Sequence, residues 1–425
     1  MRHLFKRCRA AGWLAGVGML FSLNAIVQAQ TPAVADGTDR LEWLGQPTLQ
    51  ELADHPFARN VWDLQVYQGR LYIASGSADD TAPGGSPPQT HLWYYTPSQN
   101  VFRFDHILPE TQIDLLVLVE QALVIPGTDS NGSWQTGSLY FQLRDTWIVW
   151  DQVPRGIHVY DVAFIGGRLF ITIGSDNSEG FSVVSSVDGQ QWNRYNIPLG
   201  QEGMYASTSL RWLPVGDQWF VNVFPAQMLR QRVASDGGVV QEPIEIGGSF
   251  YRMNIDAEGQ NVTFEPASVD FFMGQHSDPN DSVIPRVMRT ARRHDGGLLY
   301  IGSTRDYGQA PVPFGLFSID PALHVQTHTF EADERPYDVI VDGEMAYALL
   351  VSAQADGAYR MRVMRSADLA AWEEVVRFSA PTFARSFALL DDMLYFGFGT
   401  NAEPLAPESG MIARIRRVIT PPESP

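Results

Sequence analysis

Cysteine and lysine are almost absent from this sequence. The only cysteine, Cys8, and the only lysine, Lys6, stand near the start of the 425-residue chain. A mature protein without this segment has no residue for a disulfide bond, a cysteine nucleophile, thiolate-bound zinc, an iron–sulfur cluster or a lysine Schiff base. Those chemistries are excluded for such a protein, and its stability must come from packing.

Long apolar runs are also scarce. The run AGWLAGVGMLFSL at 11–23 is shorter than the roughly 18 to 20 residues of a membrane-spanning helix. Four basic residues precede it, and the small residues of Val27-Gln28-Ala29 follow it, which is the pattern of a cleaved export signal. We therefore expect residues 1–29 to be a signal peptide removed after Ala29, no membrane insertion after cleavage, and a periplasmic or secreted location.

Positive charge is low as well. The chain has 30 basic and 48 acidic residues, a net charge of −18. Without the four basic residues of the signal, 26 basic residues face the same 48 acidic ones, and the net charge becomes −22. This excess disfavours polyanionic partners, so we expect no nucleic-acid partner. Acidity also keeps an exported protein soluble without any special site.

No long helical periodicity is found, and a strand-rich repeat takes its place. Seven copies, each anchored on one apolar residue, follow one another at intervals of 46 to 52 residues, except for one interval of 80. The anchors are Leu71, Leu123, Leu169, Trp219, Leu299, Ala346 and Leu394. A repeat of this length built from strands is typical of a propeller blade. We expect an all-β chain with one seven-bladed β-propeller at 30–419 and a disordered tail at 420–425.

The third copy shows how each repeat divides into four strands, a to d. Residues 159–174 form two strands around the turn at Gly166 and Gly167, and a second pair turns through Asp188 and Gly189. The last copy has only three strands. We predict that residues 40–45 supply the fourth, so that Glu42 and Trp43 lie beside 412–416 and no edge stays open.

Long connections are expected on one face of this ring. The b-to-c and d-to-a loops share a face, and the long b-to-c loops are 75–91, 126–137, 302–315 and 399–410. Loops on a rigid scaffold commonly carry binding sites, so we place any site on this loop-rich face, near the central channel.

The 80-residue interval marks two further features of this face. We expect an inserted loop or hairpin at 225–249 and a long loop at 268–285 that carries Phe271, Phe272 and His276. These segments either wall a pocket over blades 4 and 5 or decorate the surface.

A recurring acid stands at the start of the innermost strands. We define the entrance residue of a blade as the one nine positions before the aromatic that follows its anchor. It is aspartate in three copies, Asp63, Asp161 and Asp338, and the fourth and last copies have Arg211 and Ser386 there. Asp114 stands one residue before the entrance position of the second copy. Four arginines precede the entrance residues Asp63, Asp161, Asp338 and Ser386, namely Arg59, Arg155, Arg335 and Arg385.

These residues have two interpretations. A ring of carboxylates and guanidiniums in the channel could hold a carboxylated or hydroxyl-rich ligand through bidentate arginine contacts. Alternatively, each aspartate bonds to backbone amides and serves only the fold. His158 stands at the same mouth and is either an acid or base or a structural histidine.

Two turns carry a family resemblance. Ser186, Asp188, Gly189 and Trp192, echoed by Ser366, Asp368 and Trp372, resemble the Asp-box of sialidase-like propellers, where it is structural in the c-to-d turn. The resemblance implies a secreted bacterial propeller. Sialidases use an arginine triad, a tyrosine with a glutamate partner and an aspartate acid. The nearest counterpart of their arginine motif is IPRVMR at 284–289, which adds Arg286 and Arg289 as candidates.

Two function classes follow from these features. The first is a non-catalytic exported propeller, which we expect to be a monomer, that binds a glycan, peptide or protein on the loop-rich face. The second is a glycan-active hydrolase or lyase at the channel mouth. Two carboxylates roughly 5 to 10 Å apart across an open cleft would support a hydrolase. A cluster of histidine, tyrosine and arginine would support a lyase. Carboxylates all bonded to backbone amides would count against both the hydrolase and the lyase.

The catalytic candidates are His158, Asp161 and Asp338. The ligand-binding candidates are Arg59, Asp63, Asp114, Arg155, Arg211, His276, Arg286, Arg289, Arg335 and Arg385. We expect no cofactor and no metal site. Calcium is the one ion that the loops 128–134 and 174–180 could take, although neither has the spacing of a recognised calcium loop.

Overall fold

The computed structural model describes most of the chain between Asp36 and Arg417. The described ranges are 36–77, 84–85, 87, 89–128, 136–154, 156, 158–175, 182–197, 207–225, 229–233, 239–243, 249–256, 261–275, 284–289, 291–305, 312–400 and 405–417. All of them belong to one compact unit that starts at Val34. In these ranges no helix has the length and apolar character needed to cross a membrane.

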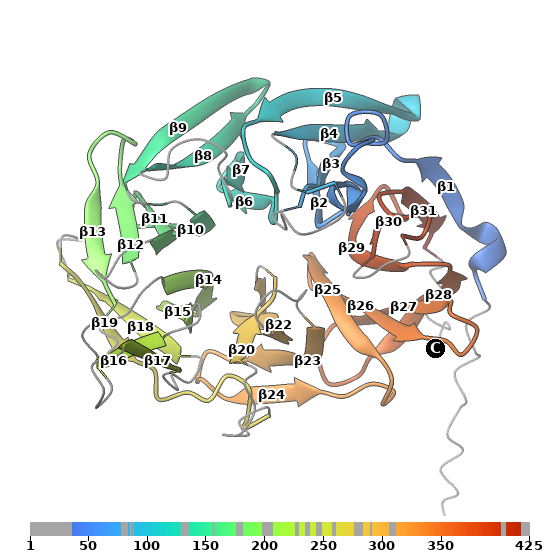
Figure 1. Ribbon diagram of the computed structural model, residues 1–425. Helices are drawn as coiled ribbons and strands as arrows, with labels where there is room; N and C mark the ends of the chain where they lie inside the picture. The colour runs from blue at the N-terminus through green and yellow to red at the C-terminus, as the bar shows by residue number, and fades with distance from the viewer. Residues whose placement is uncertain are drawn as a thin grey trace, which may run out of the picture. The chain divides into compact units, whose positions relative to one another are not determined.

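The described residues form seven antiparallel blades arranged in a ring, which confirms the predicted β-propeller (Figure 1). Blade 1 contains β2 (Asp63–Tyr67), β3 (Arg70–Ala74), β4 (Thr90–Thr96) and β5 (Val101–Leu108). Blade 2 contains β6 (Val117–Val119), β7 (Ala122–Pro126), β8 (Thr136–Leu143) and β9 (Thr146–Pro154). Blade 3 contains β10 (His158–Ile165), β11 (Arg168–Ser175), β12 (Ser182–Ser186) and β13 (Asn193–Asn196).

The remaining blades follow the same order, with two additions. Blade 4 contains β14 (Ser207–Val215), β15 (Gln218–Pro225), β18 (Ser249–Ile255) and β19 (Val262–Pro266), and between its strands a hairpin forms from β16 (Leu229–Val233) and β17 (Val239–Pro243). Blade 5 has a divided inner strand, β20 (Ile284–Val287) and β21 (Arg292–His294), beside β22 (Gly297–Arg305), β23 (Val312–Ile319) and β24 (Val325–His328). Blade 6 contains β25 (Arg335–Asp342), β26 (Met345–Ala353), β27 (Tyr359–Ser366) and β28 (Glu373–Ala380).

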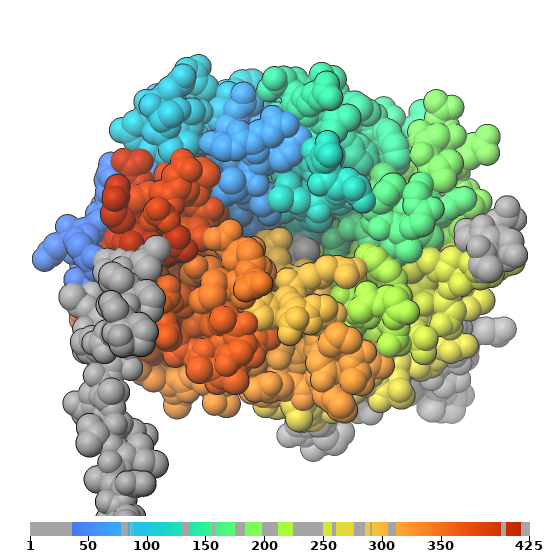
Figure 2. Space-filling view, turned by 180° about the vertical axis from the view of Figure 1, so that it is seen from behind, coloured from blue at the N-terminus to red at the C-terminus, as the bar shows by residue number. Residues whose placement is uncertain are grey.

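The last blade is completed by the N-terminal strand, as predicted. Blade 7 contains β29 (Phe383–Leu390), β30 (Met393–Gly399), β31 (Ile412–Arg416) and, as its outermost strand, β1 (Glu42–Gly45). Glu42 lies opposite Arg414 and Trp43 opposite Ala413. Figure 2 shows the result from behind: the first blade lies directly beside the last. The ring is therefore closed by strands from both ends of the described chain.

Apolar residues pack between neighbouring blades rather than within a single central core. One cluster joins blades 6 and 7 through Phe378, Phe387 and Phe396. Another joins blades 4 and 5 around Tyr300 and Phe317. Because each blade buries one face against the next, the ring depends on every blade being in place. Short 3-10 helices, η1 (Thr38–Arg40), η2 (Pro56–Arg59) and η3 (Pro97–Gln99), complete the described structure.

Candidate functional site

Four of the inner strands carry a β-bulge immediately before the entrance residue. The pairing register shifts between Val159 and Asp161 and, in blades 4, 6 and 7, at the corresponding positions just before Arg211, Asp338 and Ser386. The extra residue of a bulge drops out of the ladder. Its carbonyl group then needs another donor, and in blades 3, 6 and 7 an arginine supplies it.

Arg289 is the principal donor. Its side chain comes from blade 5 and donates to the carbonyl oxygens of Trp62, Tyr337 and Arg385, which belong to blades 1, 6 and 7. Tyr337 and Arg385 are the bulge residues of their strands, and Trp62 directly precedes an entrance residue. One buried guanidinium therefore ties four blades together across the channel. Arg211 does the same on a smaller scale, donating to the carbonyl of the bulge residue Tyr160 at 2.8 Å.

The three entrance aspartates join neighbouring blades. Each carboxylate accepts one backbone N–H from the next residue of its own strand and one from the following blade. The distances to the following blade are 2.9 Å in each case, from Leu116 to Asp63, from Trp212 to Asp161 and from Phe387 to Asp338. The distances within the strand are 2.8 to 2.9 Å. All three aspartates are buried, with at most 2% exposure.

This burial shifts the proton equilibria of the three carboxyl groups. Desolvation raises the pKa of Asp161 to about 6, against the opposing effects of Arg211 and the two amide bonds. It raises the pKa of Asp338 to about 6 and raises that of Asp63, where the charge of Arg289 is the main opposing influence. The nearest ion pair of the group, Arg289 with Asp63, is long at 4.0 Å.

Other candidates lie at blade joints or on the surface. Nδ1 of His158 lies 2.5 Å from the carbonyl oxygen of Thr128 in the preceding blade. Arg335 donates to the carbonyl of Pro313 at 2.9 Å, and Arg385 stacks over the ring of Trp62 at 4.4 Å from its centroid.

The rest of the predicted set is dispersed. Arg59 donates to the carbonyls of Leu52 and Ala53, outside the channel. Asp114 accepts from the side chain of Gln112, and Arg286 is half-buried in β20. Arg155 and His276 lie outside the described residues. The structure thus brings Asp63, Asp161, Asp338, Arg211, Arg289 and Arg385 together around the channel.

Arg292 joins blades 5 and 6 and was not among the predicted residues. Counting nine positions back from Tyr300 gives Ala291, so Arg292 is one residue out of step, as Asp114 is in blade 2. Arg292 donates through Nε to the carbonyl of Val339 at 3.3 Å. The count could not have found it, because Arg292 pairs with Leu299, whereas the entrance residues of other blades pair three positions farther from the a-to-b turn, as Asp63 does with Ala74.

A separate hollow of about 240 Å³ lies beside blade 1. It is bounded by the segment before β2 and by the β3–β4 connection, which is one of the long b-to-c loops. Nδ1 of His55 lies 3.2 Å from the carbonyl oxygen of Gly85, and His91 packs on Phe104. The lining residues are Gln50, Glu51, Leu52, Ala53, Asp54, His55, Pro87, Gln89 and His91.

The long loop at 268–285 contributes core rather than a pocket wall in its described part. Phe271 stacks on Phe250 with ring centroids 4.2 Å apart, and Phe272 packs edge-on against Phe317. Both phenylalanines are buried, and the hydroxyl of Tyr300 donates to the carbonyl of Phe271 at 2.6 Å. Residues 276–283 lie outside the described part.

The two c-to-d turns singled out by the sequence share one geometry. Oδ1 of Asp188 accepts the N–H groups of Gln190 and Gln191, and Oδ1 of Asp368 accepts those of Ala370 and Ala371, all at 2.8 to 3.0 Å. The tryptophans that end these turns, Trp192 and Trp372, each pack against the outer strand of the preceding blade. These turns therefore help to fix the spacing of the blades.

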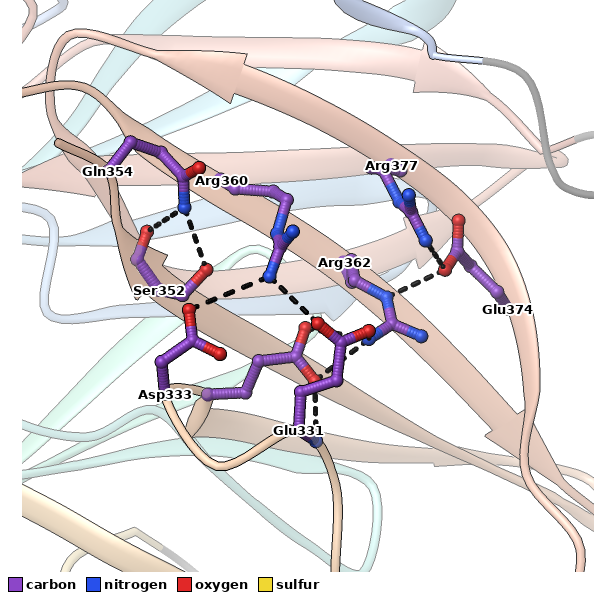
Figure 3. Close-up of polar contacts among 9 residues, drawn as sticks. Glu331, Asp333, Ser352, Gln354, Arg360, Arg362, Glu374 and Arg377 are labelled. Carbon is purple, nitrogen blue, oxygen red and sulfur yellow. Dashed lines mark hydrogen bonds and ion pairs between the residues drawn. The ribbon is translucent and has the colours of Figure 1, made fainter. Parts of the chain in front are cut away.

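An extensive ion-pair network lies on blade 6 (Figure 3). Arg362 contacts Glu331 and Glu334 from the β24–β25 connection and Glu374 from β28, at 2.6 to 2.8 Å. Arg360 extends the network to Asp333, and Arg377 shares Glu374. Every carboxylate here faces an arginine, so the network has the character of a structural clamp.

Among the described residues, Tyr140 and Glu110 form a hydrogen-bonded tyrosine and glutamate pair. The hydroxyl donates to Oε1 at 2.8 Å, but both residues are buried between blades 1 and 2, out of reach of a substrate. No group of three or more histidine, cysteine, aspartate or glutamate side chains suited to a metal occurs in the described ranges. Most of each loop considered for calcium lies outside them.

No family model and no curated protein matches this chain. Solved structures resemble it at 10 to 11% identity. One from the mitotic checkpoint complex has a TM-score of 0.46, with 98% of each chain covered. A β-fructofuranosidase from Bombyx mori has a TM-score of 0.36, with 88% of this chain and 98% of that chain covered. A prolyl endopeptidase has a TM-score of 0.43, with 84% of this chain covered, and this chain spans about half its length. None of these likenesses bears on activity.

Proposed function

We propose that this chain is an exported, non-catalytic binding propeller that takes a glycan on its loop-rich face. The observation that supports this proposal is the state of the channel carboxylates. Asp63, Asp161 and Asp338 are buried, and both oxygens of each accept backbone amides. A general acid, base or nucleophile must reach the atom on which it acts. These three side chains cannot do so without dismantling the joints between blades.

The remaining catalytic candidate, His158, also has a partner in the backbone. His158 lies within hydrogen-bond distance of a backbone carbonyl of the neighbouring blade. The hydrogen-bonded pair of Tyr140 and Glu110 is buried in the core. The matched turns at Asp188 and Asp368 serve packing between blades. They therefore support a place among sialidase-like propellers for the architecture of the blades only.

The hollow beside blade 1 is our candidate for the binding surface. Its lining combines amide, imidazole and carboxylate side chains, namely Gln50, Gln89, His55, His91, Glu51 and Asp54. Groups of these kinds form hydrogen bonds with the hydroxyls of a sugar. The carboxylates of Glu51 and Asp54 disfavour an anionic ligand, so the described lining favours a neutral, hydroxyl-rich one.

The test is a glycan array followed by a hydrolase and lyase screen on the chain from Gln30 onward. We expect binding without turnover, and weaker binding in His91→Ala. His324→Ala is the matched control, because His324 is an exposed histidine of blade 5 that pairs with Asp320 and lies far from the hollow in sequence. Turnover that disappears in both Asp161→Asn and His158→Ala would overturn the proposal in favour of a glycan-active enzyme. Equal glycan binding by the two histidine variants would refute the site.

A further inference from the structure

The hollow beside blade 1 continues into an aromatic surface on the outer strands of the same blade. His91 and Trp93 are two residues apart on β4, so their side chains share one face of the blade. On β5, Ile107 lies opposite His91, and Phe104 lies opposite Trp93. Residues directly opposite each other in an antiparallel pair point to the same face. All four side chains therefore lie together, and we call them the rim patch.

A β-bulge brings the two members of the rim patch on β5 onto this face. Phe104 and Ile107 are three residues apart, and a regular strand would turn them to opposite faces. The pairing register shifts between Leu92 and Trp93, so β5 contains one extra residue at this point, which offsets the alternation by one. The ring of Phe104 consequently packs edge-on against two rings of β4, with its centroid 5.6 Å from that of His91 and 5.9 Å from that of Trp93.

The rim patch is open to solvent although it is largely apolar. Phe104 is 47% exposed and Ile107 is 44% exposed. Both come from the outermost strand of blade 1, at the outer edge of the ring (Figure 1). The hollow adjoins the patch, because His91 both lines the hollow and contacts the ring of Phe104. Polar side chains thus border one end of an exposed aromatic surface.

The size of the hollow indicates that a ligand longer than one sugar unit extends beyond it. Its volume is about 240 Å³, below the roughly 300 to 1,000 Å³ of pockets that enclose a drug-sized molecule. One sugar unit fits in such a space, whereas an oligosaccharide must continue outside it. The rim patch offers a surface for this continuation, because it begins at His91 in the wall of the hollow.

We propose that the rim patch is a second subsite for the glycan, so that the protein recognises a neutral oligosaccharide of at least two units; this inference rests on the function proposed above. The first unit occupies the hollow and forms hydrogen bonds there. The next unit lies against Phe104, because the C–H groups on a sugar face carry a small positive charge and the face of an aromatic ring is negative. A pyranose with equatorial substituents, as in β-linked glucose, presents such C–H groups on both faces, so we expect this configuration.

Other occupants match only one of the two adjoining surfaces. An acyl chain or an apolar peptide would cover Phe104 but would offer no hydrogen-bond partners to the amide, imidazole and carboxylate groups of the hollow. A small polar ligand would fill the hollow and leave the rim patch exposed. A sugar chain satisfies both surfaces, because each unit has hydroxyl groups around its edge and C–H groups on its faces.

The experiment compares glucose, cellobiose and cellotetraose as probes of the chain from Gln30 onward, by titration calorimetry and, for glucose, by saturation-transfer NMR. We expect affinity to rise from one unit to two. Phe104→Ala should weaken cellobiose binding by about tenfold and leave glucose binding unchanged, because only the second unit touches this ring. Phe164→Ala is the matched control, since Phe164 is a 42% exposed phenylalanine on β10 of blade 3, and it should bind both probes as the unaltered protein does.

Three further variants separate the two subsites and the kind of contact. Gln89→Ala removes a polar group of the hollow and should weaken glucose and cellobiose binding alike. Phe104→Tyr keeps an aromatic ring and should retain the affinity for cellobiose. Phe104→Leu keeps apolar area without a ring and should bind cellobiose as weakly as Phe104→Ala does.

The outcomes distinguish this inference from the proposed function. Equal cellobiose affinity in Phe104→Ala and Phe164→Ala, equal affinity of the unaltered protein for glucose and cellobiose, or no binding of the glucose series overturns the second subsite, while glycan binding on the array leaves the proposed function standing. Absence of binding to every glycan of the array overturns both. A dimer that Phe104→Ala converts to a monomer, with cellobiose affinity unchanged, would assign the rim patch to contact between copies of the chain and would also refute the subsite.

Discussion

Each entrance aspartate accepts two backbone N–H groups, one from its own strand and one from the next blade, with a single side chain. Asp161 accepts the N–H of Val162 through one oxygen and that of Trp212, in the next blade, through the other. An asparagine has only one acceptor oxygen, and its amide would turn a donor toward a donor. Buried amide groups need partners, so aspartate suits this position although its charge is costly to bury.

This cost predicts a distinctive pH dependence for Asp161. Burial raises its pKa to about 6 in the folded state, above the unfolded value near 3.8, so the folded state binds more protons between these values. Its contribution to the free energy of unfolding is therefore fully present below about pH 4 and is lost as the pH rises through about 6, a change of about 3 kcal/mol. Urea unfolding from pH 4 to 7 should show the stability advantage of the unaltered protein over Asp161→Asn shrinking across this window.

The matched control for this experiment has the opposite sign. The amides of Gln191 and Gln190 lower the pKa of the exposed Asp188, so its contribution is present above the unfolded pKa and is lost as the pH falls. The advantage of the unaltered protein over Asp188→Asn should accordingly stay nearly constant from pH 4 to 7 and shrink only below about pH 4. A constant difference between the unaltered protein and Asp161→Asn from pH 4 to 7 would contradict the burial argument.

Among elements, the connection between β24 and β25 depends on the blade 6 network. Arg362 contacts Glu334, whose side chain is only 1% exposed, and Glu374, which is 11% exposed. Removing one partner of a buried ion pair leaves the other charge uncompensated. We expect Arg362→Ala to lower the free energy of unfolding by about 3 kcal/mol, measured by urea denaturation.

A second arginine of the same strand provides the comparison. Arg365 pairs with Glu373 at 2.9 Å, but Glu373 is 64% exposed. Because exposed pairs contribute little, Arg365→Ala should cost about 1 kcal/mol or less. If the two variants were equally stable, the network on blade 6 would be no stronger than a surface ion pair.

Elements with a strong local sequence pattern could be predicted, and features without one could not. The repeat and the hairpin glycines Gly166 and Gly167 were enough for seven blades and their order. The first residue of every a-to-b turn has positive φ, yet in four of the turns this residue is not glycine but Gln68, Glu120, Asp295 or Asp391. The Arg289 joint was beyond reach for another reason: it bonds to carbonyls, which every residue has, so no side-chain pattern records its partners.

On the scale of the whole molecule, closure relies on a short N-terminal segment. β1 pairs with β31, and upstream of it Gly37 donates to the carbonyl of Arg377 while the side chain of Thr38 accepts the N–H of Ser379, both in blade 6. Glu42 also binds Arg414 in a bidentate ion pair at 2.7 and 2.8 Å. The segment thus covers the outer edge of blade 7 and fastens it to blade 6.

A chain that begins at Gln46 should therefore fold less stably and expose the free edge of β31. We expect thermal unfolding at a clearly lower temperature, and self-association by size-exclusion chromatography, since an unpaired edge recruits other strands. Arg414→Gln is the control, because it keeps β1 and loses only the ion pair with Glu42, worth about 1 kcal/mol or less, and one hydrogen bond to the hydroxyl of Tyr95. A synthetic peptide of residues 36–46 should restore the melting temperature by adding the missing strand in trans. A shortened chain that melts together with Arg414→Gln, or that gains nothing from the peptide, would mean that the ring does not need this strand to close.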